Sequence, residues 1–273
     1  MTESTIQTQQ AGLGTPVLSA NGLAKTYGTG QAARQVLGDI SFEVYDGETV
    51  CIVGPSGAGK TTLLRCLSGL MPASGGTVRL RDETVTEPPA GLAVVFQDYS
   101  RSLMPWMTVR ANVELPLRGT PGLSKAGRRE RALTALASVG LDGCGHQYPW
   151  QLSGGMQQRV AIARALAYEP AVLLMDEPFA SVDAQTRADL EDLTHTIKER
   201  YNMTILLVTH DIEESVYLAD RVIVLSGTPT SVSEIVPVDL PYPRDQVHTK
   251  STPAFAALRT HVMGLIRKPE ETA

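Results

Sequence analysis

The sequence has few cysteines, no long hydrophobic run and no excess of positive charge. Spanning a bilayer takes about 20 consecutive apolar residues, and no run approaches that length. The three cysteines (Cys51, Cys66 and Cys144) lack metal-ligand spacing, and their odd number predicts reduced thiols. A count of 24 Lys and Arg against 29 Asp and Glu argues against a non-specific nucleic-acid grip. Because residues 1–14 also lack a signal-peptide pattern, we expect a soluble intracellular protein that binds no nucleic acid.

Apolar residues occur in short stretches that predict an α/β fold. Of the 273 residues, 42% are hydrophobic, enough for one large domain or two lobes. Strand-like stretches occupy residues 40–44, 49–53, 171–175, 204–208 and 221–225. Leucines and one isoleucine follow two of these strands at helical spacing, at Leu63, Leu64, Leu67 and Leu70 and at Leu190, Leu193 and Ile197. Alternating strands and helices predict a mainly parallel sheet.

The middle of the chain predicts a helical insertion. Prolines punctuate this region, and helical patterns lie at 128–139 and 156–167. Its basic group, Lys125, Arg128, Arg129 and Arg131, is interpreted as a solvated helix face, with a partner site as the alternative. We therefore expect four parts: a flexible leader at 1–16, an α/β core at 17–97 and 168–240, a helical subdomain at 98–167, and a C-terminal tail at 241–273 with a short amphipathic helix.

Residues 54–61 match the phosphate-binding pattern G-x-x-x-x-G-K-T between a predicted strand and a predicted helix. Backbone N–H groups of such a loop and helix start surround phosphate oxygens. Lys60 adds a full positive charge, and the Thr61 hydroxyl suits Mg²⁺. We therefore predict nucleotide binding by Gly54, Pro55, Ser56, Gly57, Ala58, Gly59, Lys60 and Thr61.

Acidic residues follow the strand at 171–175. The carboxyl end of such a strand lies beside the phosphate loop, so we expect Asp176 to bind Mg²⁺ and Glu177 to polarise the attacking water. Two exposed loop acids are the alternative. His210 ends the next strand and should face the γ-phosphate. The other histidines are expected to be structural, with His195 on a helix surface: His146, His195, His248 and His261.

A Ser-Gly-Gly sequence precedes the predicted helix at 156–167. Ser153 suits the N-cap position, and Gly154 and Gly155 expose backbone N–H groups at a second helix start. A second anion site in one chain is explained if it serves the nucleotide of another subunit. An ordinary capped helix is the alternative.

From about residue 17 to 226, the order of these motifs resembles that of the ATP-binding cassette (ABC) ATPases. The resemblance implies a P-loop NTPase core with a mainly parallel sheet, an N-terminal antiparallel β portion and an inserted helical subdomain. It identifies Leu152–Arg159 as the family signature and extends the phosphate loop to Thr62. Met156 stands where many members carry Gln, a variant that resembles one importer branch.

The resemblance also implies roles that spacing alone does not give. Gln97 would sit at the hinge before the insertion, where it would bind Mg²⁺ and act in catalysis by reporting the γ-phosphate, and Tyr27 would stack on adenine. Asp183 would belong to the D-loop at the nucleotide site. That loop reads Ala-Ser-Val-Asp at 180–183, where the family usually has Ser-Ala-Leu-Asp.

In the family, two copies form a head-to-tail dimer. Lys60 of one protomer and Ser153 of the other would then hold the same ATP, with Mg²⁺, and hydrolysis would open the dimer. The stretch 99–109 and the tail at 241–267 resemble the nitrate, sulfonate and taurine importer branch. We therefore expect integral membrane permease subunits as partners, a solute-binding protein indirectly, and a peripheral location at the cytoplasmic face of the cell membrane.

Several alternatives share part of this pattern. An ABC exporter or lipoprotein-extraction ATPase has the same catalytic motifs. A non-transport ABC ATPase of the repair type carries a long coiled coil, for which the 93 residues from Lys60 to Ser153 leave no room. Translation types usually join two cassettes in one chain. A phosphate-loop kinase would lack Leu152–Arg159 and His210. Nitrate, sulfonate and taurine all stay open as solutes.

Overall fold

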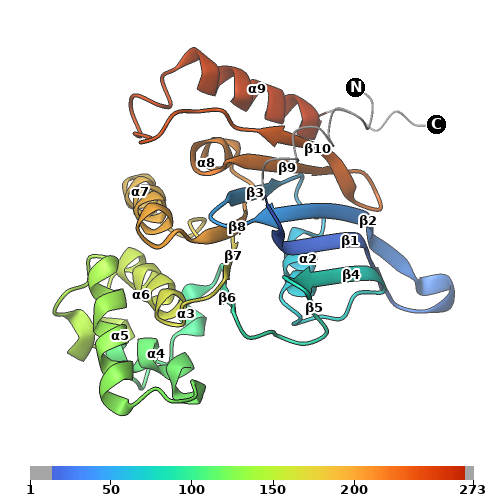
Figure 1. Ribbon diagram of the computed structural model, residues 1–273. Helices are drawn as coiled ribbons and strands as arrows, with labels where there is room; N and C mark the ends of the chain where they lie inside the picture. The colour runs from blue at the N-terminus through green and yellow to red at the C-terminus, as the bar shows by residue number, and fades with distance from the viewer. Residues whose placement is uncertain (1–13, 268–273) are drawn as a thin grey trace.

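Two β-sheets with helices around them make up residues 14–267, the part of the chain that the computed structural model describes (Figure 1). One sheet is antiparallel, in the order β2-β1-β4-β5. Its strands are β1 (Pro16–Tyr27), β2 (Arg34–Tyr45), β4 (Gly75–Leu80) and β5 (Glu83–Thr84), with a short 3₁₀ turn η1 (Gly30–Ala32) between β1 and β2. The expected N-terminal antiparallel portion is confirmed.

The second sheet has the order β10-β9-β3-β8-β7-β6. Its strands are β3 (Thr49–Val53), β6 (Leu92–Val95), β7 (Val172–Asp176), β8 (Thr204–Val208), β9 (Arg221–Ser226) and β10 (Ser231–Pro237). All neighbouring pairs are parallel except β10 with β9. The mainly parallel sheet predicted from the apolar runs is therefore confirmed.

The parallel sheet separates two hydrophobic cores. In β3, Val50 and Ile52 belong to the core shared with the antiparallel sheet and helix α2 (Lys60–Leu67), whereas Cys51 and Val53 belong to the other core. Because successive strand residues point to opposite faces, a strand buried on both sides is apolar over most of its length. All five residues of β3, β7 and β8 are buried, and the polar ones lie at strand ends, at Thr49, Asp176 and Thr204.

Helices between β6 and β7 form a separate group at the lower left of Figure 1. They are α3 (Tyr99–Ser102), α4 (Val109–Glu114), α5 (Lys125–Ser138) and α6 (Gly154–Ala167), joined by the 3₁₀ turns η2 (Leu115–Gly119), η3 (Cys144–His146) and η4 (Pro149–Gln151). α6 packs against α3, α4 and α5 and continues into the larger hydrophobic core. The division of the chain into four parts stays a prediction, and most of the expected leader, residues 1–13, lies outside the described residues, as do 268–273.

The remaining helices are α7 (Ala184–Tyr201), α8 (Ile212–Leu218) and α9 (Pro253–Arg267). α9 packs against α8, β9 and β10, as Figure 1 shows. None of the helices within residues 14–267 is long and apolar enough to cross a membrane.

The segment 241–252 before α9 is held on α7 and α8 by polar contacts. Arg244 is buried and donates hydrogen bonds to the carbonyl oxygens of Tyr217 (2.7 Å) and Ala219 (2.8 Å) at the end of α8. Lys250 Nζ lies 3.0 Å from the buried Glu191 carboxylate on α7. A region without regular secondary structure is thus fixed by charged side chains.

Two expectations about single residues are wrong. Leu70 is half exposed and follows the end of α2, because the helix stops at Leu67 before Gly69 with φ of 70°. His195 is buried rather than on a surface, since Tyr217 and Tyr242 pack edge-on against its ring. Burial lowers the His195 pKa to about 4, so the ring is neutral.

Candidate functional site

The phosphate loop lies between the end of β3 and the start of α2. Gly57 and Gly59 have φ of 82° and 74°, a region that favours glycine. A Cβ on Gly59 would approach Val36 Cγ1 to 2.6 Å, and one on Gly54 would approach the Leu225 carbonyl oxygen to 2.9 Å. The glycines therefore allow a turn that is packed closely on one side, whereas a Cβ on Gly57 would meet nothing within 4 Å.

The Lys60 side chain reaches back across this loop. Its Nζ donates to the carbonyl oxygens of Gly54 (2.9 Å) and Pro55 (3.1 Å). Burial lowers the pKa of Lys60, while the negative charges of Glu177 and Asp176 raise it. A buried ammonium among carbonyl groups is suited to bind an anion, because phosphate oxygens would return the solvation that burial removes.

Thr61 and Asp176 form the part of the site that suits a metal ion. Thr61 Oγ1 lies 3.4 Å from Asp176 Oδ1, and the carboxylate is buried. Burial raises the pKa of Asp176, partly opposed by the Thr61 hydrogen bond, so a cation would stabilise its charged form. Within residues 14–267 no three or more His, Cys, Asp or Glu side chains form a metal cluster. One carboxylate and one hydroxyl fit Mg²⁺, which takes its other ligands from water and phosphates.

Glu177 lies one residue beyond Asp176 and receives contacts from two directions. His210 Nδ1 is 3.2 Å from Glu177 Oε2, and Gln97 Nε2 donates to the same oxygen at 3.1 Å. The Glu177 backbone has φ of 42°, and its N–H donates to the Val208 carbonyl oxygen at 2.8 Å. The non-glycine positive φ turns the chain at the tip of β7, so the carboxylate lies between the strand ends. No described contact within residues 14–267 joins Gln97 to Thr61 or Asp176.

Tyr27 ends β1 and contacts the same helix as the phosphate loop. Its hydroxyl lies 3.2 Å from Thr62 Oγ1 and 3.2 Å from Met71 Sδ. The side chain is 40% exposed, which leaves ring surface for a flat aromatic ligand. The structure thus places the residue expected to stack on adenine beside the first turn of α2.

The Ser-Gly-Gly sequence lies elsewhere. Ser153 caps α6 by accepting a hydrogen bond from the Met156 N–H at 3.3 Å, and Figure 1 shows α6 in the helical group, apart from α2. Asp183 caps α7 by accepting from the Thr186 N–H (3.0 Å) and hydroxyl (2.7 Å). A Cβ on Gly155 would lie 2.5 Å from Thr186 Cγ2, so these two helix starts are in contact.

The predicted residues therefore fall into two groups. Lys60, Thr61, Asp176, Glu177, His210, Gln97 and Tyr27 gather around the phosphate loop, whereas Ser153, Gly154, Gly155 and Asp183 gather at the starts of α6 and α7. The ion pair of Arg187 with Asp211, 3.4 Å between Nη1 and Oδ2, was not predicted from the sequence. It joins the start of α7 to the loop at residues 209–211, the histidine loop, which carries His210. No local sequence pattern predicted the pair, because Arg187 and Asp211 lie 24 residues apart in the chain.

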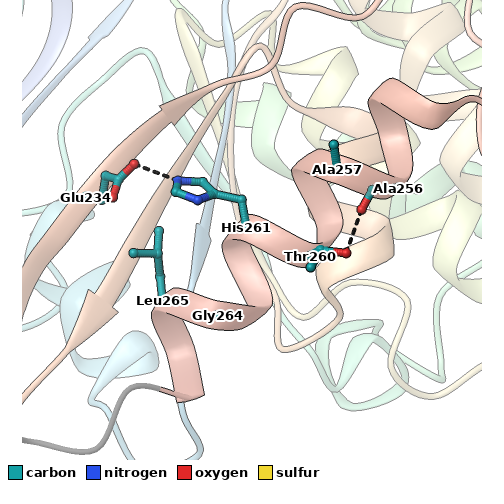
Figure 2. Close-up of a pocket in the computed structure, with 7 residues that line it drawn as sticks. All are labelled: Glu234, Ala256, Ala257, Thr260, His261, Gly264 and Leu265. Atoms are coloured by element: carbon teal, nitrogen blue, oxygen red, sulfur yellow. Dashed lines mark hydrogen bonds and ion pairs between the residues drawn. The ribbon is translucent and has the colours of Figure 1, made fainter.

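An open groove lies away from both groups. Figure 2 shows it along α9 beside β10, with a volume of about 720 Å³, lined by Glu234, Ala256, Ala257, Thr260, His261, Gly264 and Leu265. His261 Nε2 lies 2.8 Å from Glu234 Oε1 across it. None of the predicted site residues lines this groove.

Comparison with known proteins agrees with the geometry. The family described as "ABC transporter" matches residues 37–180, more than half of the chain. A protein of Brucella abortus, named only for ATP binding, is 44% identical and covers 90% of this chain and 92% of its own length. The taurine import ATP-binding protein of Yersinia pseudotuberculosis is 42% identical, covering 93% and 99%. The aliphatic sulfonates import ATP-binding protein of Bacillus licheniformis is 41% identical, covering 88% and 90%.

A solved structure is similar as well. It is the dimeric structure of an ATP-binding cassette in a post-hydrolysis state bound to ADP and phosphate, with a TM-score of 0.71 and 32% sequence identity. The match covers 81% of this chain and 98% of that one.

Proposed function

The chain belongs to the ABC transporter family of ATP-binding proteins, and from this premise we propose that it is the ATP-hydrolysing subunit of an importer for a small sulfonate-like solute. Its fold is that of the ABC ATPases, and it binds and hydrolyses ATP as members of the family do. Two relatives at 41–42% identity are named for import of aliphatic sulfonates and taurine, which supports this solute class. The proposed solutes also include nitrate, because the sequence resembles the nitrate, sulfonate and taurine importer branch.

The observation that carries the hydrolytic role is the contact of Glu177 with His210 at the strand ends beside the phosphate loop. Lys60 and the loop N–H groups bind the β- and γ-phosphates. Glu177 accepts a proton from the attacking water. The water oxygen bonds to the γ-phosphorus, and the bond between this phosphorus and the ADP oxygen breaks. His210 and Gln97 hold the Glu177 carboxylate in place. Mg²⁺, held by Thr61 and Asp176, would neutralise charge on the phosphate oxygens.

The separation of the two residue groups supports a head-to-tail dimer. Residues 153–155 and Asp183 lie at the starts of α6 and α7, and no described contact within residues 14–267 joins them to the phosphate loop of their own chain, so a second copy would supply them to each ATP. A helix start with exposed N–H groups suits a γ-phosphate. The 32% identical cassette is itself a dimer bound to ADP and phosphate, in agreement with this arrangement.

Exposed aromatic side chains support a membrane partner. Trp106, nine residues after Gln97, is 73% exposed, and Trp150 is 69% exposed and stacked on Tyr148 at 5.8 Å between ring centroids. Tryptophans of this exposure suit contacts with a partner helix. We propose that integral permease subunits bind the helical group at these tryptophans, with the solute-binding protein acting only through them. The ATPase would then be peripheral at the cytoplasmic face of the membrane.

Capture from solubilised membranes tests the importer proposal. The tagged Glu177→Gln variant, expressed in the organism of origin with Mg-ATP, is expected to retain a polytopic membrane protein that mass spectrometry identifies. A strain lacking the gene is expected to lose growth on taurine or an alkanesulfonate as sole sulfur source, and the wild-type gene to restore it. Recovery of no membrane protein would argue against the transporter role, and undiminished growth on both compounds and on nitrate would exclude this solute class.

A further inference from the structure

The first turn of α7 contacts two functional segments at once. Thr186 packs against Gly155 at the start of α6, and its N–H and hydroxyl bind Asp183. The next residue, Arg187, pairs with Asp211. One helical turn therefore lies between the Ser-Gly-Gly helix and the loop that carries His210.

Asp211 fixes the histidine loop from within. Its Oδ1 accepts the N–H groups of Glu213 (2.9 Å) and Glu214 (3.1 Å) and so caps α8, while its own N–H donates to Thr209 Oγ1 at 3.0 Å. The second carboxylate oxygen, Oδ2, is the one that faces Arg187 Nη1. The two oxygens of one side chain thus join α8 and α7 on either side of His210.

Arg187 also lies close to a buried acid. Glu214 is 4% exposed, and the Arg187 charge acts on it in the direction that favours its ionised form. Arg187 is only about one-third exposed, and its Nε is buried with no hydrogen-bond partner among the described residues. A guanidinium in this environment is held by its charged neighbours, unlike a surface arginine that moves freely.

We propose that Arg187 is a positioning residue for ATP hydrolysis, which fixes the His210 loop relative to the first turn of α7. The inference rests on the proposed function, because it requires that His210 act on the Glu177 carboxylate. Arg187 touches neither ATP nor the attacking water. Arg187 acts on His210 through Asp211. Because the neighbouring Thr186 contacts Gly155, the position of α6 also affects the position of His210.

A double-mutant cycle in the full-length protein tests this role. Asp211→Asn keeps a good helix cap but removes the charge that Arg187 contacts. We expect Arg187→Ala to lower kcat about tenfold while the KM for Mg-ATP and the affinity for ATP stay within twofold, and Arg187→Lys to restore most of kcat. In the Asp211→Asn background, Arg187→Ala should have little further effect, because the two residues act as one unit.

Matched controls separate positioning from folding. Arg259→Ala removes the 2.6 Å ion pair between Arg259 on α9 and the exposed Glu213 on α8, the helix that Asp211 caps, and should leave kcat unchanged. Should Arg187→Ala fail to fold, Asp211→Asn and Arg187→Lys still decide, since Asp211→Asn alone should lower kcat. The inference is overturned if Arg187→Ala matches Arg259→Ala, or if the two substitutions multiply independently. If His210→Ala keeps wild-type kcat, the proposed function fails instead. If His210→Ala abolishes turnover while Arg187→Ala leaves kcat unchanged, only this inference fails.

Discussion

His210 Nδ1 lies 3.2 Å from Glu177 Oε2 because the two residues follow adjacent parallel strands in register. The ladder pairs Asp176 of β7 with Val208 of β8, and the Glu177 N–H continues it by donating to the Val208 carbonyl oxygen. This contact is therefore set by the hydrogen bonding of the sheet. A change of register in either strand would separate the two side chains.

Glu177→Gln is expected to bind ATP with near wild-type affinity and to hydrolyse it at least a hundredfold more slowly. The amide keeps the shape and can still contact His210, but it cannot accept the proton from water. Phosphate release and equilibrium ATP binding measure the two effects, and light scattering should show an ATP-dependent dimer. Glu199→Gln, an exposed change on α7, is the control. Hydrolysis close to that of the control would show that Glu177 is not the proton acceptor.

Lys60→Ala is expected to weaken ATP binding by roughly one to two orders of magnitude. It removes the charged donor that contacts the carbonyl groups of Gly54 and Pro55, and a hydrogen bond to a charged group contributes about 1.5–3 kcal/mol. Titration calorimetry with ATP measures the change. Lys125→Ala, on the exposed face of α5, should bind ATP normally. Equal affinities of the two variants would contradict the placement of the γ-phosphate at Lys60.

Most of the parallel sheet could be predicted from sequence because a strand buried on both faces is apolar over most of its length, as at residues 172–175 of β7. β1 could not, because its pairing with β2 contains several register shifts that interrupt the alternation of apolar and polar residues. His195 was misplaced for a different reason. Its neighbours Thr194 and Thr196 are polar, and Tyr242, which helps to cover it, lies far along the chain. Burial by a distant segment leaves no local pattern.

The site could also be predicted only in part, because contacts between distant segments leave no local sequence pattern. Lys60, Asp176, Glu177 and His210 follow strands that can be recognised, so their meeting at one sheet edge could be predicted from topology. The Arg187–Asp211 pair depends instead on how α7 and α8 cross, which no periodicity encodes. The same is true of the contact between Gly155 and Thr186.

Stability is expected to fall as the pH rises from 6.5 to 8, and Glu214→Gln should remove most of that slope. Burial, reinforced by Glu191 and Asp211, raises the Glu214 pKa to about 8 from an ordinary 4.5. Between these values the folded state binds a proton that the unfolded state releases, so raising the pH favours unfolding by up to about 1.4 kcal/mol per unit.

The range above pH 6.5 excludes the opposing contribution of His195. Its pKa is lowered to about 4, so it destabilises the fold only as the pH falls from 6.5. Urea denaturation at several pH values measures the slope, with Glu199→Gln expected to retain the wild-type dependence. Parallel wild-type and Glu214→Gln curves would mean that Glu214 is ionised in the folded protein.

Arg244→Ala is expected to lower the free energy of unfolding by about 2–4 kcal/mol, since it removes buried hydrogen bonds to the carbonyl groups that end α8. Arg244→Lys should recover part of the loss, and Arg129→Ala, an exposed change on α5, should cost less than about 0.5 kcal/mol. The urea midpoint measures all three. An unchanged midpoint for Arg244→Ala would show that 241–252 contributes nothing to holding α8.

The order of the parallel sheet has a consequence for biosynthesis. The strand that precedes the phosphate loop, β3, is flanked by β8 and β9, which end at Val208 and Ser226. At about 5–20 residues per second, a ribosome needs on the order of ten seconds or more to travel from Val53 to Ser226. The growing chain therefore contains the phosphate loop long before either flanking strand has been synthesised. ATP can therefore bind only a nearly finished chain, and until then the apolar surface of β3 lacks the strands that cover its edges.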